Sequence, residues 1–133
     1  MREIPTHTVN EGEQVTIRDQ FFKESDGTFY VLDDIHSAVA RVFDLGQDAQ
    51  EVPTYQEYLV IDDVFYDTPQ IDVGWAVDDT GFNFKWTAPG LAWRRGGRDY
   101  RLVVDVLVVS DSIAETLAPK TWEYRIRARG VQP

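Results

Sequence analysis

The chain of 133 residues contains no cysteine, one methionine and only two histidines, His7 and His36. Without cysteine, neither disulfides nor thiolate metal sites can hold the fold together. Neither histidine has a second histidine and an acidic residue at metal-ligand spacing, and no catalytic triad order is visible. No Gly-x-x-x-x-Gly-Lys or Gly-x-Gly-x-x-Gly sequence occurs, so nothing points to a nucleotide phosphate site. We therefore expect no cofactor, no resident metal and no enzymatic activity.

Long apolar runs are also missing. The longest, Val106–Val109, is far shorter than the ~20 residues that span a bilayer. The first eight residues lack the apolar segment of a signal peptide. We therefore expect neither a membrane partner nor a secretion signal.

The composition is that of a folded domain, with 43% hydrophobic and 13% aromatic residues. A chain of this length is most simply one domain, here residues 1–133, and can bury a sizeable core. No linker, low-complexity run or fixed-period repeat divides it.

The net charge of −10 is divided unevenly along the chain. Residues 1–83 carry 4 Lys and Arg against 18 Asp and Glu, whereas residues 84–133 carry 9 against 5. An acidic surface repels nucleic-acid phosphate, so a nucleic-acid partner is not expected. The uneven charge has two interpretations: solubility alone, or unlike poles that help copies or partners dock head to tail.

Alternating apolar and polar residues predict strands along most of the chain. The segments are 14–22, 37–45, 55–66, 73–77, 82–88, 102–109 and 122–129, with a further short strand or ordered loop over 29–32. Turns are predicted at 24–27, 67–70 and 78–81. Seven to nine strands with no repeated helical segment predict an all-β fold, an immunoglobulin-like antiparallel β-sandwich.

Three segments are ambiguous. Ser37–Leu45 is rich in alanine and competes as a helix, but its β-branched residues favour a strand. Asp62-Asp63 interrupts 55–66, which predicts two short strands around a bend. Residues 46–53 are expected to be a polar loop, and 111–118 could form a turn of helix before Pro119.

Tyr100 follows Gly96-Gly97 and precedes the longest predicted strand. Immunoglobulin-like sandwiches place a tyrosine there, and its hydroxyl bonds to backbone just upstream. We predict such a tyrosine corner at Tyr100, and expect Tyr100→Phe to cost on the order of 1 kcal/mol or more.

The one basic cluster beside an aromatic residue comprises Trp93, Arg94, Arg95 and Arg98. In an acidic chain we interpret it as an interface for another protein, with Trp93 as an exposed anchor, and a phosphate ligand as the alternative. On this view Trp93→Ala weakens assembly more than folding. Trp93 and Trp75 together could instead form a sugar-stacking platform. Acidic loops such as Asp33-Asp34 and Asp78-Asp79 are interpreted as solvated, with calcium as the alternative.

Two stretches carry a resemblance to a known family. They are a strand, an Asp-Gly turn, Val31-Leu-Asp-Asp34 and Ala38-x-Ala-x-Val-x-Asp-Leu45 over 14–45, and Thr80-Gly-Phe-Asn-Phe84 with Gly96-Gly-Arg-Asp-Tyr-Arg-Leu-Val-Val104 over 80–104. The pattern resembles small immunoglobulin-like structural proteins of tailed bacteriophages. In those proteins a Gly-Tyr-Asn-Phe tag precedes a Gly-Gly-x-x-Tyr-x-Val strand, and Phe82 replaces the tyrosine here. The middle of the chain, 46–78, departs from the family by an acidic insertion.

The resemblance implies a virion component without catalysis, made in the host cytoplasm. Its expected place is the head, as a capsid decoration or cement protein, or the tail, as a baseplate adaptor or connector. The implied partners are the major capsid protein or tail proteins, together with copies of the chain itself. A carbohydrate-binding module is the alternative from another class.

Overall fold

The computed structural model describes residues 5–23, 27–46, 53–93, 96–109 and 116–130. Within them lie eight strands: β1 (Thr6–Asn10), β2 (Val15–Asp19), β3 (Ile35–Asp44), β4 (Tyr55–Tyr58), β5 (Phe65–Gln70), β6 (Phe82–Ala88), β7 (Arg98–Val109) and β8 (Leu117–Arg129). Short helical turns join them: η1 (Leu32–Asp34), α1 (Ile61–Val64) and η2 (Gly90–Trp93). No helix in this described part is long and apolar enough to cross a bilayer. The molecule is mostly β, as predicted.

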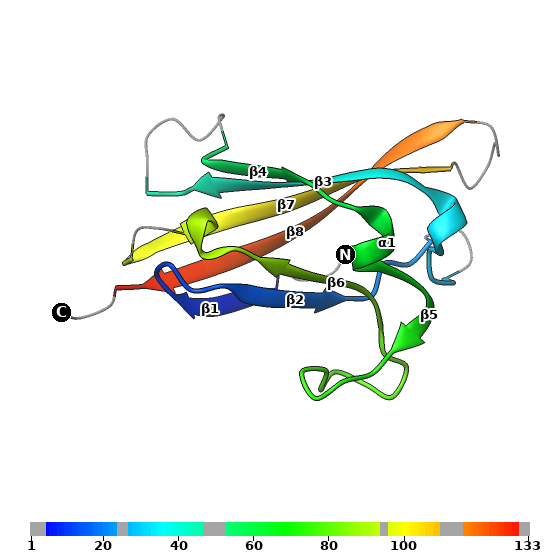
Figure 1. Cartoon of the computed structure of the whole chain (residues 1–133), viewed down its shortest axis with the longest axis horizontal. Coiled ribbons are helices and arrows are strands. Elements are labelled where there is room, and N and C mark those ends of the chain that lie inside the picture. Colours follow the sequence, from blue (N-terminus) through cyan, green and yellow to red (C-terminus); the bar gives the residue numbers. More distant parts are fainter. Residues whose placement is uncertain (1–4, 24–26, 47–52, 94–95, 110–115, 131–133) are drawn as a thin grey trace.

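The strands form two sheets, which overlap in the view of Figure 1. One sheet has five strands in the order β1-β8-β7-β3-β4, and the other has three in the order β2-β6-β5. The longest pair is β7 with β8, which runs antiparallel from Arg98 opposite Ala128 to Val109 opposite Leu117. This pair forms the middle of the larger sheet and fixes the positions of the arginines discussed below.

One edge of the larger sheet differs from the prediction. Strand β1 lies parallel to β8, with Thr6 opposite Arg125 and Asn10 opposite Arg129. The expectation of a wholly antiparallel sandwich is therefore wrong at this edge. No strand was expected before residue 14, because β1 has only one buried apolar residue, Val9. Its pairing with β8, rather than its own alternation, makes it a strand.

The core lies between the sheets, where one side of each main strand is buried. Its fully buried residues include Ile17, Phe84, Leu102 and Ile126, each with an exposed fraction of 0%. The Phe21 ring is stacked between Trp122 and Phe84, with centroid distances of 3.8 and 4.6 Å. Because Trp122 lies on β8 and Phe84 on β6, this stack joins the two sheets.

Asn83 is the one fully buried polar side chain of β6. Its side-chain amide donates to the carbonyl oxygens of Phe21 and Tyr30, at 3.1 and 2.9 Å. Its side-chain oxygen accepts from the amide of Phe21 at 2.7 Å. Asn83 thus satisfies the amide of Phe21 and the carbonyl oxygen of Tyr30, and adds a second bond to the Phe21 carbonyl oxygen, which also accepts from the Tyr30 amide. These bonds fasten Phe21 and Tyr30 to β6.

The segment 55–66 breaks where Asp62-Asp63 predicted a bend. Strand β4 ends at Tyr58, α1 forms one turn over Ile61–Val64, and β5 begins at Phe65. The predicted turn over 67–70 is wrong, because these residues form the second part of β5. Ser37–Leu45 is a strand rather than a helix, since β3 lies between β7 and β4 and is paired on both sides.

The predicted strand over 73–77 is also wrong. These residues belong to a loop between β5 and β6, and the exposed fractions of Val73 and Val77 are 107% and 71%. A strand needs a neighbour that satisfies its backbone, and this segment has none in the described residues. Most of the predicted loop over 46–53 and of the predicted helical turn over 111–118 lies outside the described residues.

Candidate protein-interaction surfaces

The structure places Trp93 in the core rather than on the surface. Its exposed fraction is 0%, and its indole N–H donates to the carbonyl oxygen of Glu13 at 2.7 Å. The prediction that Trp93 is an exposed interface anchor is therefore wrong. The reason is the turn η2, which directs the indole inward beneath the β1–β2 turn. The approach is so close that a Cβ on Gly90 would lie 1.9 Å from the carbonyl oxygen of Gly12.

Of the three arginines in the predicted interface, Arg94 and Arg95 lie outside the described residues. Arg98 begins β7, and its Nη1 donates to Oδ2 of Asp44 at 3.1 Å. Asp44 has an exposed fraction of only 4%, and its other oxygen accepts from the amide of Gly46. Because a nearly buried carboxylate needs this partner, Arg98 has a structural role beside any binding role.

Tyr100 is buried near the start of β7, with an exposed fraction of 2%. Its ring meets that of Trp93 edge to face, at a centroid distance of 6.3 Å. Position and burial are those that a tyrosine corner requires. The hydroxyl-to-backbone bond that defines such a corner stays a prediction.

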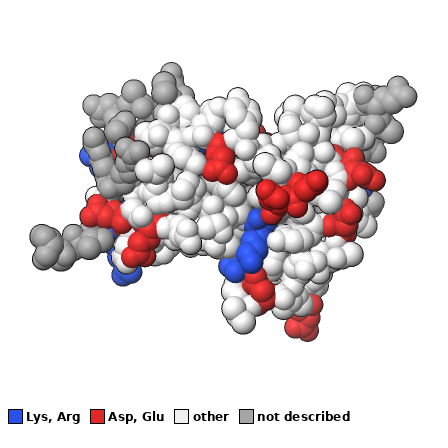
Figure 2. Space-filling view, viewed as in Figure 1, with Lys and Arg blue, Asp and Glu red and all other residues white. Residues whose placement is uncertain are grey.

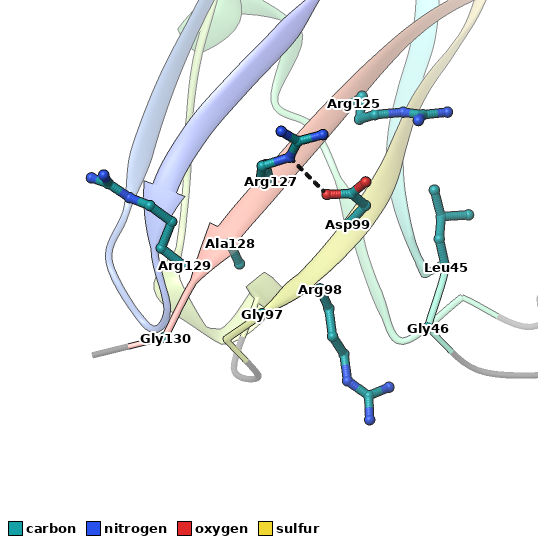
Figure 3. A pocket seen from close by; sticks show the side chains of 10 residues that line it. All are labelled: Leu45, Gly46, Gly97, Arg98, Asp99, Arg125, Arg127, Ala128, Arg129 and Gly130. Carbon is teal, nitrogen blue, oxygen red and sulfur yellow. Dashed lines mark hydrogen bonds and ion pairs between the residues drawn. The ribbon is translucent and has the colours of Figure 1, made fainter. Parts of the chain in front are cut away.

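A hollow of about 720 Å³ lies where β7 begins and β8 ends (Figure 3). We call it the arginine hollow. It is lined by Leu45, Gly46, Gly97, Arg98, Asp99, Arg125, Arg127, Ala128, Arg129 and Gly130. The side chains of its four arginines point in different directions, and three of its ten lining residues are glycines (Figure 3).

The β8 arginines line the arginine hollow because side chains along the strand face the core and the solvent in turn. Tyr124, Ile126 and Ala128 face the core, so Arg125, Arg127 and Arg129 face outward. Arg127 bonds Asp99 of β7 at 3.2 Å, as the dashed line in Figure 3 marks. Arg125 and Arg129 have no ion-pair partner among the described residues. The pairing of β8 with β7 then places these arginines around the same hollow as Arg98.

The second distinctive surface is the loop Ile71–Gly81, which projects below the sandwich in Figure 1, beyond β5. We call it the projecting loop. It exposes Ile71, Val73 and Val77, with exposed fractions of 60%, 107% and 71%. Apolar side chains gathered on one projection, rather than scattered singly, are typical of protein-binding surfaces.

Asp72 fastens the first half of the projecting loop to the sandwich. Its carboxylate pairs with Arg18 Nε at 2.8 Å and with Lys85 Nζ at 3.0 Å, and accepts from the amide of Gly74 at 3.0 Å. Desolvation raises the pKa of Asp72, but the bonds from Lys85 and Arg18 outweigh it and hold that pKa below its ordinary value. Gly74 lies against the guanidinium, where a Cβ would be 2.4 Å from Cζ of Arg18.

Asp78 closes the second half of the projecting loop. Its Oδ1 accepts from the amides of Thr80 and Gly81 at 3.0 and 3.1 Å, and its Oδ2 accepts from Gln20 at 2.9 Å. The bond from Gln20 and then that from Gly81 lower the pKa of Asp78. Two aspartates therefore hold the loop in one shape, and its apolar side chains are presented without a large loss of conformational freedom on binding.

Charge on the face seen in Figure 2 is mostly negative and scattered. Lys and Arg gather there in one short central strip and near the left end. The acidic and basic residues are therefore not mixed evenly over this face.

The two tryptophans of the sugar-binding alternative do not form a platform. Trp93 has no exposed ring face. Trp75 is half-buried, its indole N–H donates to Asp78, and its ring lies 5.6 Å from that of Phe82. No observation favours a carbohydrate ligand.

The histidines lie apart from both surfaces. His36 is exposed on β3, and His7 is half-buried on β1 with its ring 6.2 Å from that of Tyr124. Burial lowers the pKa of His7, and the nearby Asp19 carboxylate opposes that shift. Among the described residues no group of three or more His, Cys, Asp or Glu side chains could hold a metal ion.

Comparisons with protein-family models, with curated proteins and with solved structures found no match for this chain. The function of the chain is therefore inferred from its own surfaces and from the resemblance over 14–45 and 80–104.

Proposed function

We propose that the sandwich is of the immunoglobulin type. In variable-type immunoglobulin domains one sheet contains strands B, E and D, and the other contains G, F, C and C′. The orders β2-β6-β5 and β8-β7-β3-β4 correspond to these. In addition, Leu102 stands two residues after Tyr100, where antibody domains have their second disulfide cysteine, and it is fully buried. A buried leucine there suits a sandwich that needs no disulfide.

We propose further that the chain is a structural component of a tailed bacteriophage virion, a decoration or cement protein of the head shell. Its partners would be the major capsid protein and further copies of itself, and it would reach the virion from the host cytoplasm. The observation that carries a protein-binding role is the projecting loop, which presents three exposed apolar side chains on a fastened backbone. The phage context depends on the resemblance over 14–45 and 80–104.

A binding site of this kind suits repeated assembly. A decoration protein is present in many copies on a shell, so weak contacts at each copy are multiplied by avidity. Fixed loop geometry lowers the entropy lost at each contact. A tail or baseplate adaptor would use the same surface, and the location in the particle distinguishes the two.

The proposal is tested with particles of the phage that encodes this chain, prepared without it. Purified protein should bind these particles and raise the temperature at which the shells release their DNA. Labelled antibody should decorate heads rather than tails. Absence of the protein from intact virions, with no binding to depleted ones, would contradict the proposal. Labelling confined to tails would instead support a tail or baseplate adaptor.

The projecting loop has a direct test in the same assay. Val73→Ser should weaken particle binding, because it removes a fully exposed apolar side chain without disturbing the fold. Leu91→Ser is the matched control, since Leu91 is also well exposed, at 59%, but lies on η2. Equal binding of the two variants would show that the loop is not the docking element.

A further inference from the structure

The projecting loop and the arginine hollow are complementary in charge. The loop Ile71–Gly81 contains three aspartates and no lysine or arginine. Asp72 is already paired with Arg18 and Lys85, so Asp78 and Asp79 supply the negative charge that the loop offers a partner. The hollow is lined by four arginines against one acidic residue, Asp99. Arg125 and Arg129 carry charges that no described ion pair neutralises. Oppositely charged surfaces of this kind steer association and fix the register of partners.

The two surfaces also fit in shape and polarity. The loop tip is a convex apolar projection with acidic flanks, as its exposed Val73 and Val77 beside Asp72, Asp78 and Asp79 indicate. The hollow is concave, and glycine backbone, Leu45 and Ala128 line it together with the four arginines (Figure 3). Its volume of about 720 Å³ lies within the ~300–1,000 Å³ of sites that enclose small ligands. A loop tip with two valines can enter a space of this size.

A loop cannot enter the hollow of its own molecule. The arginine hollow lies at the end where β8 runs toward the C-terminus, whereas the projecting loop extends from the side near β5 (Figure 1). Any contact between them must join two molecules. It is a contact between different patches, so each molecule added leaves one free loop and one free hollow.

We infer that the arginine hollow of one copy receives the projecting loop of the next, so that the protein assembles head to tail. The valines fill the hollow, and Asp78 and Asp79 of the loop face Arg125 and Arg129. This inference specifies how copies meet within the proposed structural role, and it rests on that role for its repeated copies. The loop that stays free at the end of each row of copies is the one that binds the shell. Depending on the rotation between copies, the contact generates a closed ring or an open filament.

Two variants block the two sides of the contact separately. Val73→Arg places a cation on the loop tip at a fully exposed position. Gly130→Trp fills the hollow, and a Cβ on Gly130 meets no atom within 4 Å, so the fold tolerates it. Matched controls lie elsewhere: Tyr58→Arg at an exposed site of β4, and Thr116→Trp beside the opposite end of β8. Unchanged far-ultraviolet circular dichroism and melting temperature verify that all four are folded.

Sedimentation velocity over rising concentration measures the association. The wild-type protein and both controls should form species larger than dimers at low salt, and these should shrink at high salt as charges are screened. Each blocked variant alone should associate at least about tenfold more weakly. An equimolar mixture of the two should form one-to-one heterodimers that do not grow, because one intact loop meets one intact hollow.

A charge variant tests the arginines separately. Arg129→Glu should weaken association, whereas Lys120→Glu, with the same change of charge near the other end of β8, should not. A monomeric wild-type protein, blocked variants that associate normally, or a mixture that stays monomeric would each overturn the inference. Binding of monomeric protein to depleted particles would leave the proposed function standing. Head-to-tail association in solution, with the protein absent from virions, would support this inference and contradict the proposed function.

Discussion

Replacing Trp93 by alanine removes the largest fully buried side chain among the described residues. Truncation of a buried tryptophan costs about 3–5 kcal/mol. The upper part of that range is expected here, since the change also leaves the carbonyl oxygen of Glu13 without its donor. For a domain of this size each kcal/mol lowers the melting temperature by about 3–5 °C, so a fall of about 12–25 °C follows.

The measurement is thermal and urea unfolding followed by far-ultraviolet circular dichroism, because the substitution changes the fluorescence signal. Leu91→Ala is the matched control: it lies two residues earlier in η2 with an exposed fraction of 59%, and should change stability by less than about 0.5 kcal/mol. Trp93→Ala should therefore impair folding before assembly, which reverses the ranking expected from the sequence. A Trp93→Ala protein within about 1 kcal/mol of wild type would refute the core assignment.

Three further substitutions test polar side chains on the strands. Asn83→Ala should cost at least about 2 kcal/mol in urea unfolding, because it removes three buried hydrogen bonds, including those to the Phe21 amide and the Tyr30 carbonyl oxygen; a near-neutral effect would show that water replaces the amide. The folded pKa of His7 is lowered below 6.5 by burial, against the opposing charge of Asp19, so the native state binds fewer protons than the unfolded one. Stability is then full above pH 6.5 and falls as the pH drops below it, and His7→Gln should remove that part of the fall; an unchanged pH profile would contradict it. Desolvation and Glu57 raise the pKa of Tyr55 to about 12, so its contribution is present below pH 10 and lost as the pH rises toward 12. Ultraviolet titration of wild type against Tyr55→Phe measures this, and a tyrosine that ionises near pH 10 would rule it out.

The long strands were predictable because their alternation is local. In β7 and β8 every second residue is apolar over many positions, and the resulting faces could be assigned without knowing the partner strand. The same holds for β6, except at Asn83. That residue alternates as if exposed but is buried, because the backbone at Phe21 and Tyr30 covers it. A covering segment is a tertiary feature that no strand pattern contains.

The errors share a physical cause, since each depends on contacts between distant parts of the chain. Trp93 adjoins two arginines in sequence, which suggests exposure, yet its partners Glu13 and Tyr100 come from other segments. Strand β1 exists because β8 offers it a free edge. The arginine hollow likewise exists only in the register that brings the end of β8 beside the start of β7.

The aspartates in the acidic middle of the chain also depend on contacts that the sequence does not show. From the sequence alone, the acidic loops that contain Asp72 and Asp78 are interpreted as solvated, with a calcium site as the alternative interpretation. In the structure Asp72 is held by two cations, and Asp78 accepts from two amides of its own turn and from Gln20. These aspartates hold an apolar loop in place, and their charge is partly used within the molecule. Net charge therefore overstates how acidic the exposed surface is, and the geometry of each carboxylate decides whether it meets solvent, its own fold or a partner.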